Sequence, residues 1–213
     1  MTQPAKVTII GAGIVGLCTA WFLQERGVEV TVLDRTGVAA GASLGNAGWV
    51  APALTLPLPE PSIFKVGIKA VIDPTSPVYV PVAANSTLLR FLAGFARHST
   101  PKMWRRNMVT FAEINKWSLE SFDRMEDGGV SAALQRAEPF LAAFTSEADR
   151  QIITHEFDEV AAGGGHVSFE KITGDELREF EPSVSTIVTH GLRVDGQRFI
   201  NPPSFMQVLA ASV

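Results

Sequence analysis

The sequence has very few of the residues that form covalent cross-links and metal centres. Among 213 residues there is one cysteine, Cys18, which excludes an internal disulfide and a cysteine-based metal site. The four histidines, at positions 98, 155, 166 and 190, show no spacing typical of metal ligands, so we predict no metal site. This low cysteine content fits the reducing cytoplasm, where we expect the protein.

Charge is also sparse and unevenly distributed. Charged residues make up 19% of the chain and hydrophobic residues 46%, a composition that favours a folded core over disorder. The net charge of −4 argues against general nucleic-acid binding. No acid occurs from Pro74 to Ala112, where the basic residues are Arg90, Arg97, Lys102, Arg105 and Arg106.

This acid-free stretch therefore carries a charge of +5, which leaves −9 for the remainder of a chain whose net charge is −4. A basic patch of this kind is suited to a surface of anionic lipid. An ordinary pair of solvated helices is the alternative interpretation.

Residues 7–23 form a run without formal charge near the N-terminus, a pattern also found in signal peptides and short membrane spans. Only Lys6 supplies a nearby positive charge, and no cleavage site is obvious. Three glycines in the run, Gly11, Gly13 and Gly16, follow nucleotide-binding spacing, which favours a folded strand, turn and helix instead.

These glycines lie between an apolar, β-like run, Lys6 to Ile10, and a helical pattern that ends near Gly27. In a Gly-x-Gly-x-x-Gly turn, the first glycine permits the tight turn and the second lets the backbone approach a pyrophosphate. The third lets the helix pack closely on the strand. The start of the helix directs unpaired N–H groups and a positive dipole end at the phosphates.

A second strand-like run, Val28 to Leu33, ends at an acid, Asp34. Asp34 follows Gly16 by 18 residues, about where a carboxylate accepts hydrogen bonds from an adenosine ribose. The strand, turn, helix, strand and acid together predict a dinucleotide-binding βαβ unit.

A loop of small and turn-forming residues comes next, where an ordinary NAD-binding fold has a helix and a third strand. The loop reads Gly41-Ala-Ser-Leu-Gly-Asn-Ala-Gly-Trp49. Small residues let the backbone lie against a flat or anionic ligand, and Ser43 and Asn46 can form hydrogen bonds with it. A plain flexible loop is the alternative.

The rest of the chain alternates between helical and strand patterns. Four prolines from Pro52 to Pro61 disfavour regular structure. The patterns predict helices over 62–72 (weakly), 85–98, from 101, 146–162, 173–180 and from about 203, and strands over 140–144, 167–169 and 187–194. An apolar stripe predicted to be core consists of Trp104, Met108, Phe111, Ile114, Phe122 and Met125.

Taken together, these features resemble the D-amino-acid oxidase superfamily of flavoproteins, and most closely its bacterial D-amino-acid dehydrogenase (small subunit) branch. The resemblance runs through the whole chain and is strongest over Val7 to Arg35 and Gly41 to Pro52. Weaker support comes from Gly191-Leu-Arg193, Asp195-Gly196 and Asn201-Pro-Pro203.

The resemblance implies an α/β fold with two domains. A discontinuous, Rossmann-like FAD-binding domain would comprise residues 1–50 and 190–213, and an inserted α+β substrate domain would comprise residues 51–189. Family members run to roughly twice this length, and only two strands of the nucleotide fold precede the long insert. We therefore expect the chain to be the N-terminal part of a longer protein.

FAD is the cofactor that the resemblance implies. The residues expected to contact it are Ile10, Gly11, Ala12, Gly13, Ile14, Val15, Gly16, Asp34, Arg35, Ser43, Asn46, Ala47 and Gly48. By family pattern, the arginine that binds the substrate carboxylate lies beyond Val213, so no catalytic residue is assigned.

The family reaction moves a hydride from the substrate α-carbon to the flavin. The resemblance thus implies oxidation of the C–N bond of a D-amino acid, with glycine or sarcosine-like amines as the next candidates. It implies a membrane quinone or another electron acceptor as partner, and hence a cytoplasmic protein or one held peripherally on the inner membrane.

Two other functions stay open from the sequence. An NAD(P)-dependent oxidoreductase would use Arg35 for a 2′-phosphate, but the loop from Ser43 to Gly48 would then have no role. A non-catalytic nucleotide-binding fragment is the other.

Overall fold

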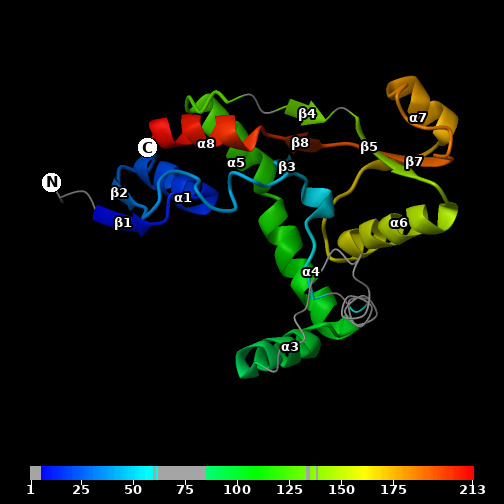
Figure 1. The fold of residues 1–213 in the computed structure, drawn as a ribbon, viewed down its shortest axis with the longest axis horizontal. Coiled ribbons are helices and arrows are strands. Elements are labelled where there is room, and N and C mark those ends of the chain that lie inside the picture. Colours follow the sequence, from blue (N-terminus) through cyan, green and yellow to red (C-terminus); the bar gives the residue numbers. More distant parts are fainter. Residues whose placement is uncertain (1–5, 60, 62–84, 133–134, 138) are drawn as a thin grey trace. The chain divides into compact units, whose positions relative to one another are not determined.

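The computed structural model describes residues 6–59, 61, 85–132, 135–137 and 139–213 (Figure 1). The helical pattern expected over 62–72 lies outside them. Contacts divide the chain into two compact units. Unit 1 comprises residues 1–52, 117–145 and 168–213, and unit 2 comprises residues 53–116 and 146–167.

The units are not bounded where the domains were predicted to be. Unit 1 includes residues 117–145 and 168–189, which the sequence assigns to the inserted domain. Compact units and evolutionary domains are different divisions of a chain. The domain bounds of 1–50 with 190–213, and of 51–189, therefore stay a prediction.

Unit 1 begins with the βαβ unit that the sequence predicts. Strands β1 (Lys6–Ile10) and β2 (Glu29–Leu33) pair in parallel along their whole lengths, and α1 (Ile14–Gln24) connects them. Gly27 follows the helix with φ +75°, which suits a glycine after a helix end. In the described part of the chain this sheet has two strands.

A second sheet in unit 1 joins segments that are distant in the sequence. Strand β8 (Gln197–Phe199) lies between β3 (Trp49–Val50) and β4 (Gln135–Ala137), and both pairings are antiparallel. The sequence patterns do not predict these strands, because two or three residues are too few to show an alternation of apolar and polar positions.

A third sheet places β7 (His190–Val194) between β5 (Phe140–Phe144) and β6 (Phe169–Thr173), again antiparallel. β5 agrees with the predicted strand, and β7 forms the second half of the one expected from residue 187. The strand expected over 167–169 was placed too early, because β6 runs on to the first residue of a capping box.

Three further helices belong to unit 1: α5 (Ser118–Asp127), α7 (Gly174–Phe180) and α8 (Pro202–Ala211). Helix α7 begins with a capping box, since Thr173 and Glu176 each accept a hydrogen bond from the other's backbone N–H. The buried core of unit 1 draws on α1, α5 and α8 and includes Leu17, Trp21, Met125, Val130, Phe205, Met206 and Leu209.

Unit 2 is built mainly from helices α3 (Ser86–His98), α4 (Pro101–Asn115) and α6 (Glu147–Ala162). Asn85, Thr100 and Ser146 are their N-caps, and each accepts a bond from a backbone N–H in the first turn. The core of unit 2 contains Trp104, Met108 and Val160, with Leu56 and Val167 packed against it. No helix among the residues that the structure describes combines the length and apolarity needed to cross a membrane.

The prediction of one continuous apolar stripe after Pro101 was wrong. Helix α4 ends at Asn115 and α5 begins at Ser118, so the helical phase does not continue from one to the other. Trp104 and Met108 are buried in unit 2, Met125 is buried in unit 1, and Ile114 is 62% exposed.

Candidate functional site

The glycine-rich turn lies at the carboxyl ends of β1 and β2, within unit 1. Gly11 has φ +111°, a value that residues with a side chain rarely adopt, and its N–H donates to the carbonyl oxygen of Leu33 at 2.7 Å. A Cβ added at Gly16 would lie 2.0 Å from the carbonyl oxygen of Gly11. The helix approaches the turn this closely only because residue 16 has no side chain, which is the role that the spacing predicts.

The first turn of α1 offers hydrogen-bond donors. Gly13 is the N-cap residue and provides no side-chain cap. The N–H of Ile14 donates to Ser43 Oγ at 2.9 Å, while those of Val15 and Gly16 have no acceptor among the described residues. Unpaired N–H groups at a helix start bind anionic groups, so this turn fits the pyrophosphate of a dinucleotide.

Asp34 joins the glycine turn to the segment after β2. One carboxylate oxygen accepts the N–H of Ala12 at 2.9 Å, and the other accepts the N–H groups of Thr36 and Gly37 at 2.7 and 3.0 Å. These bonds, that from Ala12 first, lower the pKa of Asp34 to about 2. The side chain is therefore ionised at neutral pH, as a group that accepts ribose hydroxyls must be.

We expect acid to weaken this junction in a defined range. The folded-state pKa is lower than the ordinary 3.8, so the stabilisation is fully present above about pH 4 and is lost as the pH falls through about 2. Melting temperatures of the wild type and of Asp34→Asn, measured across this range, should converge toward low pH. A constant difference between the two would contradict the role given to the charge.

The small-residue loop lies against the start of α1. A Cβ added at Gly13 would lie 3.1 Å from Ser43 Oγ. The loop is held internally by Asn46, whose Nδ2 donates to the carbonyl of Ser43 at 2.7 Å and whose Oδ1 accepts the N–H of Gly48 at 2.6 Å. The loop thus has specific hydrogen bonds that a plain flexible loop lacks.

Gly48 fixes the far end of this loop. It has φ +71°, and an added Cβ would lie 2.1 Å from the carbonyl oxygen of Ile200. Its own carbonyl accepts the N–H of Ile200 at 2.8 Å. The loop is therefore fixed to the segment that leads into α8, a connection that the sequence pattern does not indicate.

Not every predicted contact residue joins this arrangement. Arg35 and Ala47 are exposed and make no hydrogen bond or ion pair within the described residues, and Ile10 is 89% exposed at the end of β1. Sequence reasoning missed Ala39, which is 3% exposed and donates its N–H to the carbonyl of Ala12 at 2.9 Å. Its backbone is left-handed, with φ 55°, a conformation that an alanine in a sequence does not indicate. Which residues touch a cofactor stays a prediction.

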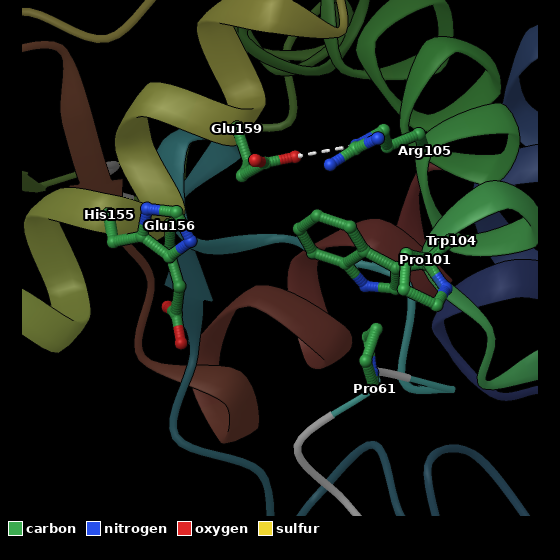
Figure 2. A pocket seen from close by; sticks show the side chains of 7 residues that line it. All are labelled: Pro61, Pro101, Trp104, Arg105, His155, Glu156 and Glu159. Atoms are coloured by element: carbon green, nitrogen blue, oxygen red, sulfur yellow. Dashed lines mark ion pairs between the residues drawn. The ribbon is translucent and has the colours of Figure 1, made fainter.

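A separate cavity of about 330 Å³ lies inside unit 2, between α4 and α6 (Figure 2). Figure 2 shows the guanidinium of Arg105 directed toward Glu159, and its Nε lies 3.6 Å from Glu159 Oε2. The indole Nε1 of Trp104 donates to the carbonyl of Pro57 at 3.1 Å. None of the residues predicted to bind the dinucleotide lines this cavity. Arg105, which does line it, forms an ion pair with Glu159.

The fold and the glycine turn define a nucleotide-binding βαβ protein. The sequence model of the DAO family, described as FAD dependent oxidoreductase, matches residues 6–213, and the chain belongs to this family. FAD is the cofactor of the family, which sets aside the NAD(P)-dependent alternative.

Three similar proteins illustrate the relationship. The chain is 29% identical over 196 residues to a D-amino acid dehydrogenase of Agrobacterium fabrum, which covers 90% of this chain and 46% of that protein. Glycine oxidase from Bacillus cereus has a TM-score of 0.56 and 19% identity, over 99% of this chain and 43% of its own. L-amino acid deaminase from Proteus vulgaris has a TM-score of 0.57 and 17% identity, over 100% of this chain and 38% of its own.

The chain thus spans about half the length of the curated relative that it matches. The solved structures, at these identities, show that the fold is shared. They confirm the predicted α/β fold class.

Proposed function

We propose that this chain forms the FAD-binding part of an enzyme that oxidises the C–N bond of an amino acid, with a D-amino acid as the substrate. The observation that carries the proposal is the start of α1. Gly16 allows the helix to reach the turn, and two N–H groups there have no acceptor among the described residues. Family membership supplies the identity of the dinucleotide.

The preference for a D-amino acid rests on one relative. The Agrobacterium protein is a D-amino acid dehydrogenase, whereas the solved structures include a glycine oxidase and an L-amino acid deaminase. Oxidation at the carbon that bears an amino group is a chemistry common to these names. Glycine or a related amine is therefore the second candidate substrate.

In this proposal FAD, when bound, would supply the acceptor for a hydride from the substrate α-carbon. The chain's own residues hold the other end of the cofactor. The first turn of α1 would hold the pyrophosphate, and the ionised Asp34 would accept hydrogen bonds from the adenosine ribose. The loop from Ser43 to Gly48, which contacts the start of α1 through Ser43, would contribute to the same site. The electron acceptor, such as a membrane quinone, belongs to the proposal as well.

The role of Asp34 can be tested with two flavins. FMN lacks the adenosine ribose, so Asp34→Ala should weaken binding of FAD about tenfold or more and leave the weaker binding of FMN unchanged. Flavin fluorescence titration of the purified chain measures both affinities. Glu25→Ala, an exposed acid at the end of α1, is the matched control.

Two outcomes would count against the proposal. Equal affinity of the wild type for FAD and FMN would mean that the adenosine half is not recognised. An equal loss of FAD affinity in Asp34→Ala and Glu25→Ala would mean that Asp34 affects binding only through its negative charge and does not contact the ribose.

A further inference from the structure

Helix α3 of unit 2 is strongly amphipathic, yet none of its 13 residues is buried. One face carries the apolar side chains Leu88, Leu89, Phe91, Leu92 and Phe95. Leu89 is 58% exposed and Phe91 is 63% exposed. The neighbouring helices α4 and α6 each bury three residues, whereas α3 buries none.

The opposite face of α3 is basic. At 100° per residue, Arg90 and Arg97 lie within a narrow arc opposite the centre of the apolar face. On α4, Lys102 and Arg106 are four residues apart and exposed, on the side away from buried Trp104. These four cations form no ion pair with any residue in the described segments.

The charge of Arg105, which belongs to the basic stretch predicted from the sequence, is offset by an acid. Its guanidinium is paired with Glu159 across the cavity of unit 2 (Figure 2). The basic surface therefore consists of Arg90, Arg97, Lys102 and Arg106. No acid occurs between residues 85 and 112 to oppose them.

The two helices are joined by a two-residue turn that is well held. Ser99 is 2% exposed, and both its N–H and its Oγ donate to the carbonyl oxygen of Phe95, at 3.0 and 2.9 Å. Thr100 then caps α4. The end of α3 and the start of α4, which carries Lys102, are therefore joined by a hydrogen-bonded turn.

We propose that α3, together with the first two turns of α4, docks on the surface of an anionic lipid bilayer. The bilayer interface accepts both halves of such a helix, because apolar side chains enter the boundary with the acyl chains while cations contact phosphate head groups. A nucleic acid would use the cations but would leave the leucines and phenylalanines in water. The proposal does not depend on the reaction proposed above.

Vesicle flotation tests this proposal. The chain is synthesised in a cell-free system that contains vesicles of equal parts phosphatidylglycerol and phosphatidylcholine, and the vesicles are then floated through a density gradient. Aggregated protein sinks, so only vesicle-bound chain rises. We expect the wild type to float with these vesicles, to float much less with pure phosphatidylcholine, and to be released by high salt.

Paired variants separate the two contributions. Phe91→Ser should lower the bound fraction about tenfold, whereas Ile152→Ser, at an apolar residue of α6 that is 60% exposed, should have no effect. Arg90→Gln with Arg97→Gln should also lower binding about tenfold or more. The control is Arg26→Gln with Lys171→Gln, which removes the same charge from unit 1.

The proposal would be overturned by a wild type that does not float. Equal flotation with neutral and anionic vesicles would overturn it as well. So would control variants that lose as much binding as the α3 variants, because binding would then not be located on α3.

Discussion

Replacing Gly16 by alanine should destabilise unit 1 by about 3 kcal/mol or more, at or beyond the upper end of ordinary overpacking. The added Cβ would lie 2.0 Å from the carbonyl oxygen of Gly11 and 3.3 Å from a methyl group of Ile9. A flexible side chain can move away from a new methyl group, but Gly11 is backbone in a left-handed conformation and is bonded to Leu33. Helix α1 must therefore move away from β1.

The matched control is Gly45→Ala, in the loop that lies beside the turn. No atom lies within 4 Å of a Cβ added there, and the backbone of Gly45 is not left-handed. Thermal melting should give a decrease of about 6 °C or more for Gly16→Ala and almost none for Gly45→Ala. FAD affinity should fall in Gly16→Ala as well. Equal melting temperatures would show that the close approach of helix and turn is not required.

The second expected result is that the 213-residue chain alone has no dehydrogenase activity. In the described residues the parallel sheet of the nucleotide fold has two strands, and the outer edge of each pairs with no other strand. Apolar side chains are exposed at its carboxyl edge, since Ile10 is 89%, Val15 78% and Leu33 54% exposed. Exposed apolar surface and unpaired strand edges promote association, so the isolated chain should be oligomeric and should bind FAD more weakly than the full-length relative does.

Dye reduction with D-alanine, flavin fluorescence and analytical ultracentrifugation measure these three properties. The Agrobacterium D-amino acid dehydrogenase, assayed in parallel, shows that the conditions support catalysis. A monomeric, yellow chain of 213 residues that reduces the dye would overturn the expectation. It would mean that two parallel strands and the residues around them are enough to shape a working site.

The sequence predicts the elements whose signals are local. A glycine spacing, an apolar face and a terminal acid are sufficient to place β1, α1 and β2. The apolar and polar patterns also predict α3, α6 and α7, whose starts are fixed in the structure by side-chain caps and, in α7, by a capping box. The short strands β3, β4 and β8 escape prediction because they are defined by their partners across the chain.

The site shows the same division. The role of Gly16 follows from its position in the motif. The structure adds that a side chain there would collide with the carbonyl oxygen of Gly11. The bonds from Ala12, Thr36 and Gly37 to Asp34 could not be predicted, because they depend on how the segment after β2 folds back on the turn. The contact of Ser43 with the start of α1 likewise needs the path of the loop.

The closing contacts of unit 1 also determine when it can form during synthesis. The side chain of Gln24 donates to the carbonyl of Val213 at 2.7 Å, across a separation of 189 residues, and Gly48 pairs with Ile200. At ribosomal rates, α1 emerges about 10–40 s before the residues that cover it. Leu17 and Trp21 therefore lack the α8 side chains of their shared core for that time. We expect the nascent chain to bind holding chaperones until α8 is synthesised.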